Sequence, residues 1–189
     1  MTDIVDQLRS ARAAYDEQAS SHYDEVLLEV SARAETSGSL GKVDLGALVA
    51  WKRLQANTPW MAKLMGTPET EVRAITARAR KAALDESVTL ARAADAARDI
   101  LGELPGCGHG HAVASAILTA SAPRRMAVYD RRARAGLSVL FDGNIPRWYS
   151  YPAYMETVDH LRAQVGPDWT NRDVDLALYK LGGREPRTP

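Results

Sequence analysis

The sequence has little cysteine, no long apolar run and no net charge. Cys107 is the one cysteine in 189 residues, which excludes an intramolecular disulfide and any four-cysteine zinc or iron–sulfur site. No run approaches the roughly 18 apolar residues of a membrane-spanning helix, and the first residues carry charges where a secretory signal would be apolar. We therefore predict a cytoplasmic protein that does not associate with membranes.

The balance of charge excludes a chain that is basic throughout. Lysine and arginine number 24, as do aspartate and glutamate. Any nucleic-acid contact must therefore come from a local basic face. Such a face is predicted in the stretch from Arg124 to Arg134, where five arginines accompany one acid, Asp130. The 46% apolar and 25% charged content is typical of a globular protein and argues against disorder.

Hydrophobic periodicity predicts an all-α fold of about eight helices. Residues 3 to 36 form one long helix or two short ones, and residues 126–129 are the best strand candidate. We divide the chain into an N-terminal helical segment (1–42), a main helical domain (43–183) and a frayed tail (184–189). Further helices are predicted at 45–55, 67–84, 87–104, 112–122, 131–141 and 152–165, with a short segment at 60–65. Thr170, with Asp173 three residues later, resembles an acidic variant of a capping box that opens the last helix.

The segment from Leu104 to His111 is the glycine-richest part of the chain. Gly106, Gly108 and Gly110 can adopt positive φ, and they lack the Cβ that would keep a neighbouring backbone away. A loop of this kind that opens a helix is typical of a phosphate site, because free amides and the helix dipole point at the anion. The alternative is a helix C-cap followed by a tight hairpin.

This hairpin and the alanine-rich helix after it resemble the helix-hairpin-helix of the DNA glycosylase superfamily, in particular a mostly uncharacterised bacterial branch. The likeness spans roughly residues 44 to 183. In that superfamily an aspartate opens another helix about twenty residues after the last hairpin glycine, and here Asp130 stands 20 residues after Gly110. Either Gly106–Gly108 or Gly108–Gly110 can be the hairpin turn, and the Asp130 spacing favours the second.

The resemblance implies that Asp130 is the catalytic carboxylate of a monofunctional DNA N-glycosylase in base excision repair. Such a carboxylate would stabilise the oxocarbenium character of the sugar while the base of a flipped nucleotide leaves. The alternative for Asp130 is a simple helix N-cap. Glycosylases that also cut the backbone use a lysine two residues after the hairpin. Gly110 or Ala112 stands there, so the resemblance implies no lyase activity.

Duplex DNA is the implied partner, and neither a cofactor nor a metal is implied. A metal site at Cys107, His109 and His111 is disfavoured because alternate loop positions are poorly placed to converge on one ion. The base pocket is expected to use the aromatic residues Trp51, Tyr129 and Trp148. The expected DNA-binding residues are Lys52, Gly106, Gly108, His109, Gly110, His111, Arg124, Arg125 and Arg131.

Two other functions compete with the enzyme. One is a non-catalytic DNA-binding module on the same scaffold, in which Asp130 only caps its helix. The other is a protein-interaction role for the apolar stripe of the N-terminal helix, although a strict heptad is absent. The enzyme predicts a concave pocket with Asp130 at its wall and aromatic rings opposite, whereas the module predicts bonds to the helix's own amides and no cavity.

Overall fold

The computed structural model describes residues 3–20, 22–145 and 150–183, and within these ranges the chain forms helices and no strand. The prediction of an all-α fold is confirmed. The helices are α1 (Ile4–Gln18), α2 (Glu25–Ser37), α3 (Lys42–Trp51), α4 (Pro59–Gly66), α5 (Glu69–Ala83), α6 (Leu90–Leu101), α7 (Ala112–Ser121), α8 (Arg131–Leu140), α9 (Tyr151–Val165) and α10 (Asn171–Leu181).

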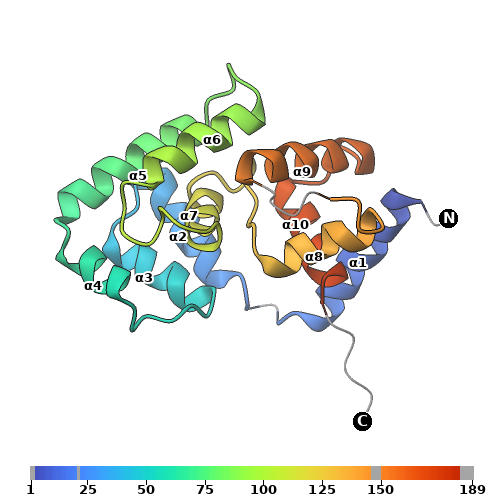
Figure 1. Ribbon diagram of the computed structural model, residues 1–189, viewed down its shortest axis with the longest axis horizontal. Helices are drawn as coiled ribbons and strands as arrows, with labels where there is room; N and C mark the ends of the chain where they lie inside the picture. Colours follow the sequence, from blue (N-terminus) through green and yellow to red (C-terminus); the bar gives the residue numbers. More distant parts are fainter. Residues whose placement is uncertain (1–2, 21, 146–149, 184–189) are drawn as a thin grey trace, which may run out of the picture.

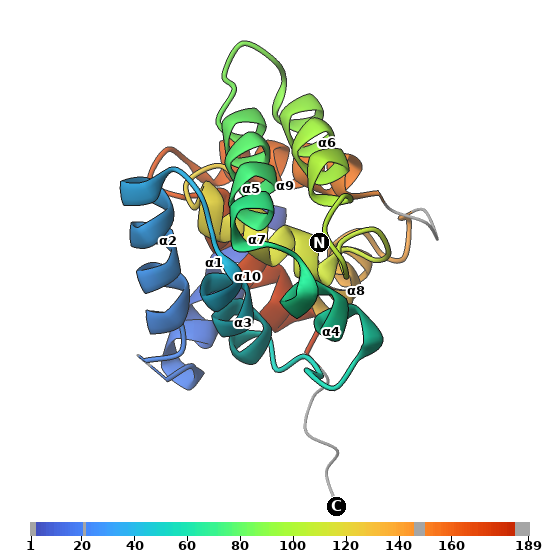
Figure 2. The same cartoon turned by 90° about the vertical axis from the view of Figure 1, so that its left-hand side faces the viewer.

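The helices form two groups that lie side by side (Figure 1). Helices α2 to α7 form the first group, with α7 at its centre in two perpendicular views (Figures 1 and 2). All side chains from Ala114 to Ser121 of α7 are buried. The second group combines the start and the end of the chain, because α1, α8 and α9 pack against α10. Helix α6 also packs against α9 and so joins the two groups.

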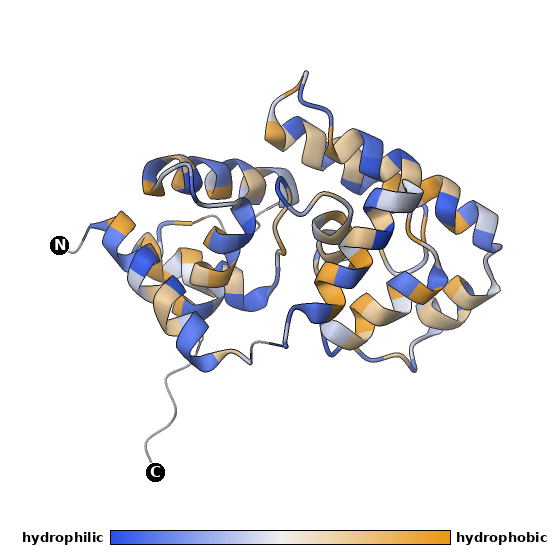
Figure 3. Ribbon diagram, turned by 180° about the vertical axis from the view of Figure 1, so that it is seen from behind, coloured by the Kyte–Doolittle hydropathy of each residue, from blue (hydrophilic) through white to orange (hydrophobic). Residues whose placement is uncertain are grey.

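Helix starts are fixed mainly by short polar side chains. Asp3, Thr89, Asp130 and Ser150 each accept a hydrogen bond from an amide in the first turn of the following helix, which satisfies donors that the helix leaves unpaired. Thr170 and Asp173 form the predicted acidic capping box of α10. Most helices carry both hydrophilic and hydrophobic residues, as the hydropathy colouring shows (Figure 3), and bury the hydrophobic ones between the helices.

Several predicted bounds need correction. Of the two alternatives for residues 3 to 36, the structure has the two short helices, one ending at Gln18 and the other beginning at Glu25. The segment around residue 60 is a helix, so the described residues hold ten helices rather than about eight. The helix predicted at 87–104 begins at Leu90, because Thr89 is its N-cap. Residues 126–129 are extended but are not part of a sheet.

The N-terminal helices pack against the rest of the chain. The apolar stripe of α1 includes Leu8 and Ala11, which are buried where α1 packs against α9 and α10, so this stripe is occupied within the chain. The boundary placed at residue 42 falls at the first residue of α3, and the domain division stays a prediction. The frayed tail at 184–189 lies outside the described residues. Among the described helices, none has the length and apolarity needed to cross a bilayer.

Candidate functional site

The extended segment 126–130 connects the two helix groups and places Asp130. Side chains satisfy its backbone: the Val128 amide donates to Asp175 Oδ2 (2.8 Å) and the Tyr129 amide to Ser115 Oγ (3.0 Å). The hydroxyls of Tyr151 and Tyr154 donate to the carbonyls of Ala127 and Val128, each at 3.0 Å. These bonds replace a sheet ladder, which explains how a strand-like sequence stays buried without a partner strand.

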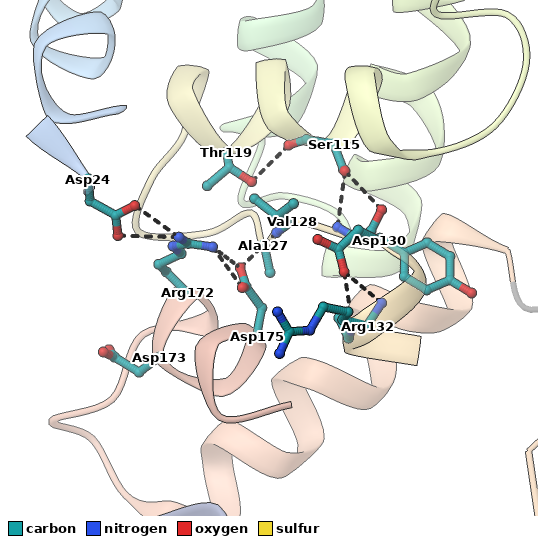
Figure 4. Close-up of polar contacts among 12 residues, drawn as sticks. Asp24, Ser115, Thr119, Ala127, Val128, Asp130, Arg132, Arg172, Asp173 and Asp175 are labelled. Atoms are coloured by element: carbon teal, nitrogen blue, oxygen red, sulfur yellow. Dashed lines mark hydrogen bonds and ion pairs between the residues drawn. The ribbon is translucent and has the colours of Figure 1, made fainter. Parts of the chain in front are cut away.

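Arg172 holds this segment to the α1–α2 link. Its Nη1 donates to both oxygens of Asp175, at 2.7 and 3.0 Å, and its Nη2 donates to both oxygens of Asp24, each at 3.2 Å. Figure 4 shows Arg172 lying between the two carboxylates. Burial raises the pKa of Asp175 to about 6, against the opposing effect of Arg172, the Val128 amide and Lys52.

Asp130 has bonds on both carboxylate oxygens. Oδ1 accepts from the amides of Arg132 (2.9 Å) and Ala133 (3.0 Å), and Oδ2 accepts from Lys52 Nζ (2.7 Å). Burial acts to raise the pKa of Asp130, but the Lys52 ammonium and the two amides outweigh it, so that pKa lies below its ordinary value. Asp130 is therefore an ionised carboxylate near neutral pH, and the predicted N-cap is present.

The Asp130–Lys52 pair borders a small polar void. The void measures about 20 Å³, and its lining includes Asp130, Lys52, Asp175 and Trp51. This volume has room for about one water molecule, with polar partners on several sides. It is far too small for a nucleobase, so the concave pocket expected at Asp130 is present only as a space for water.

A much larger open groove adjoins the void. It measures about 950 Å³. It lies between α1, the α1–α2 link, Arg53 just beyond α3, and the facing parts of α8 and α10. Tyr15, Tyr23 and Tyr179 line both the void and the groove. These three rings therefore separate the paired charges around Asp130 from the open space.

The hairpin glycines have different roles. Gly106 has a φ of +87° and a Cβ there would lie 2.3 Å from Trp60 Cε3, so its lack of a side chain serves packing inside the protein. Gly110 also has positive φ, +74°, but nothing lies within 4 Å of the position of its Cβ. Residues 108–110 are exposed. Residues 108–110 are thus the exposed tip, whereas the hydrogen-bonded turn lies just before them, where the Cys107 amide donates to the Leu104 carbonyl (3.1 Å). The hairpin register stays a prediction.

The histidines and the cysteine of the hairpin lie in different surroundings. Cys107 is buried at 1% exposure, and burial raises the pKa of its thiol to about 12. His109 is exposed, whereas the His111 ring lies against the Tyr129 ring in a tilted arrangement, with ring centroids 5.0 Å apart. No group of three or more His, Cys, Asp or Glu side chains that could hold a metal ion occurs in the described part of the chain.

The predicted arginines do not form one surface. Helix α7 has ten residues and a rise of about 1.5 Å per residue, so Arg124 and Arg125 lie at the end of α7 opposite the hairpin. Arg125 Nη2 donates to the carbonyl of Asp85 in the α5–α6 loop (3.1 Å). The segment 126–130 then runs back toward the other end of α7, so that Tyr129 lies beside His111 at the hairpin. Arg131 follows Asp130 there and is exposed.

Two of the three predicted base-pocket residues, Trp51 and Tyr129, are buried in the core. Trp51 is 6% exposed and donates from Nε1 to Asp24 Oδ1 (3.2 Å), yet it lines the void. Tyr129 is 4% exposed and stacks on Tyr154 with ring centroids 4.4 Å apart. Trp148 lies outside the described residues.

The aromatic lining of the groove and the role of Arg172 are not predicted from the sequence. Tyr15 and Tyr179 are far apart in sequence, and only the packing of α1 on α10 brings their rings to a centroid distance of 6.2 Å. A signal was present for Arg172, since it lies three residues before Asp175, the spacing of an intrahelical ion pair.

Comparisons of the chain with protein-family models, with curated proteins and with solved structures found no match. The resemblance to helix-hairpin-helix glycosylases therefore depends on the sequence pattern alone.

Proposed function

We propose that the protein binds duplex DNA through its hairpin tip and hydrolyses the N-glycosidic bond of a flipped nucleotide, with Asp130 as the carboxylate. The observation that carries the proposal is the state of Asp130. It is ionised and fixed by Lys52 and two amides, and it borders a void with room for one water molecule. An ionised carboxylate beside water is the pair of groups that hydrolysis of a glycosidic bond needs.

The chemistry uses this carboxylate in two ways. Its charge stabilises the oxocarbenium character that develops on the sugar, and its oxygens orient the attacking water. The C1′–N bond breaks, the hydroxyl of water bonds to C1′, and the proton of water goes to the departing base. Asp130 Oδ2 becomes available for this role when Lys52, 12% exposed, turns toward a phosphate.

The hairpin supplies the expected DNA contact. The tip at residues 108–110 is exposed, and α7 begins without a side-chain cap, so amides of its first turn point outward from a region that carries the positive end of the helix dipole. Arg131 lies at the same end of α7. We therefore include Gly108, His109, Gly110 and Arg131 in the proposed contact surface, and Arg124 and Arg125 at the opposite end stay separate predictions.

A non-catalytic DNA-binding module is the second candidate. Two observations favour it. Both Asp130 oxygens are already occupied by Lys52 and the amides of α8, and the void beside Asp130, about 20 Å³, is too small for a nucleobase. In that function Asp130 has the role of an N-cap and ion-pair partner alone.

Strand scission after alkali separates the two candidates. Labelled duplexes carrying uracil, alkylated purines, 8-oxoguanine or mismatches are incubated with the wild type, Asp130→Asn and Asp173→Asn. Asparagine caps helices about as well as aspartate. Asp173 is the N3 residue of the α10 capping box and, like Asp130, is a carboxylate at a helix start that accepts from a backbone amide and pairs with a cation, Arg12, so the latter variant is a matched control. Enzymatic function predicts alkali-dependent breaks with the wild type and the control only. Binding of all three proteins without breaks would favour the module.

Salt dependence tests the DNA contact itself. Duplex affinity should fall with salt, since phosphate contacts release counterions. The variant Arg131→Gln is expected to reduce the slope of log affinity against log salt by about one, whereas Arg124→Gln, at the other end of α7, should leave it unchanged. Equal slopes for all three proteins would place the duplex elsewhere.

A further inference from the structure

The open groove beside Tyr15, Tyr23 and Tyr179 has a consistent chemical character. Among the described residues that line it, three side chains are cationic and none is a carboxylate; the cations are Arg53, Arg132 and Lys180. In the described part of the chain, none of the three forms an ion pair with an acid. Arg132 and Lys180 donate instead to neutral groups, the Tyr179 hydroxyl and the Gln18 amide oxygen.

Flat surfaces accompany these charges. The Arg132 guanidinium lies over the Tyr179 ring at 3.9 Å from its centroid, and Arg53 lies over the Tyr23 ring at 6.0 Å. A guanidinium stacked on a ring is pre-oriented and offers its outer face to another planar group. Burial, followed by the charge of Asp24, raises the pKa of Tyr15 to about 12, so this ring stays neutral near neutral pH.

Arg53 has an unusual backbone. Its φ is +52°, directly after the C-cap residue of α3, at a position where glycine is the common choice. Arginine there is strained, and its side chain is exposed at the groove. The strained backbone does not favour folding, and the side chain adds positive charge to a groove that is already cationic. Both features indicate that Arg53 contributes to binding an anionic ligand.

We propose that this groove binds a nucleoside 5′-monophosphate unit, with the base stacked against the tyrosine and arginine planes and the phosphate held by Arg53, Arg132 and Lys180. Planar rings and unpaired cations together match a base and a phosphate. The amide group of Gln18 and the hydroxyls of Ser10 and Ser20 also line the groove and supply hydrogen bonds to base edges. The proposal goes beyond the reaction at Asp130 and does not depend on it.

The test is isothermal titration of the full chain with AMP, adenosine and inorganic phosphate. We expect AMP to bind at least tenfold more tightly than adenosine or phosphate. The double variant Arg53→Gln/Lys180→Gln should weaken AMP binding at least tenfold. The control Lys81→Gln/Arg92→Gln removes one lysine and one arginine that are exposed outside the groove, and it should bind AMP as the wild type does.

A displacement experiment identifies whether the nucleotide unit comes from free nucleotide or from the end of a strand. A 5′-phosphorylated single-stranded oligonucleotide that displaces AMP indicates a strand terminus, and no displacement indicates free nucleotide; either result supports the groove. The absence of AMP binding by the wild type, or equal affinity of the two double variants, would overturn the proposal. Because the readout is AMP binding, failure here is distinct from failure of base release from duplexes.

Discussion

The void at Asp130 and the groove next to it share three tyrosines but differ in how their charges are satisfied. Around the void, Asp130 is paired with Lys52, and Arg172 is paired with Asp24 and Asp175. Along the groove, the cations Arg53, Arg132 and Lys180 face no carboxylate in the described lining. Paired, half-buried charges hold the two helix groups together, whereas cations bonded only to neutral groups are available to an anionic ligand.

The largest effect is expected from the inner network. Replacing Arg172 by methionine leaves Asp175, 3% exposed, without its cation, and should lower the free energy of unfolding by about 3 kcal/mol. Urea denaturation measures the loss. The control is Arg162→Met, which breaks the more exposed Arg162–Asp159 pair and should cost less than 1 kcal/mol. Equal losses would show that the inner pairs are no more important than surface pairs.

Two hairpin glycines allow a similar comparison, between Gly106, which is packed against Trp60, and Gly108, where an added Cβ would make only an ordinary contact. Gly106→Ala places a methyl group 2.3 Å from Trp60 at a φ of +87° and should destabilise the fold by about 3 kcal/mol. Gly108→Ala, where the nearest atom to the new methyl group would be the Gly102 carbonyl oxygen at 3.6 Å, should change stability by less than 0.5 kcal/mol. Thermal unfolding of both variants checks this difference. A Gly106→Ala protein as stable as Gly108→Ala would contradict the packing role of Gly106.

The Lys52–Asp130 pair gives a pH-dependent prediction. Because the folded protein holds the pKa of Asp130 below its ordinary value of 3.8, the stabilisation is present above pH 3.8 and is lost as pH falls through the folded pKa. Asp130→Asn should therefore cost about 2 kcal/mol at neutral pH. The difference from wild type should shrink steadily below pH 4.

Urea titrations of the two proteins between pH 2.5 and 7 measure this difference. A constant difference across that range would mean that Asp130 is not stabilised as a carboxylate in the folded protein.

The smallest expected effect concerns the groove. Arg53→Gly relieves a positive φ but adds freedom to the unfolded chain, so it should raise stability by about 0.5 kcal/mol while weakening AMP binding. Asp142→Gly relieves the other non-glycine positive φ in the described residues, 49°, and should leave AMP binding unchanged. Calorimetry of both variants provides the stability and the affinity. If both variants bound AMP equally well, Arg53 would have no part in the groove.

The sequence predicted the local features of the molecule well. Helix periodicity, the Asp130 cap and the capping box at Thr170 and Asp173 depend on residues within one or two turns of each other, and all appear in the structure.

The site itself depends on contacts that spacing does not encode. Lys52 reaches Asp130 across 78 positions and Val128 reaches Asp175 across 47, and neither separation follows a helical or strand period. The groove requires α1 and α10, the two ends of the chain, to pack together. The arginines were grouped by sequence proximity, but helix α7 separates Arg124 and Arg125 from Arg131 by its own length.

The release of free base from a lesion-containing duplex is the most direct test of catalysis by Asp130. Mass spectrometry detects the released base, so no strand break is needed to observe the reaction. We expect base release by the wild type and by Asp173→Asn, and none by Asp130→Asn, with all three proteins folded and bound to the duplex. Release by Asp130→Asn at the wild-type rate would contradict the assignment of the carboxylate and reduce Asp130 to a helix cap.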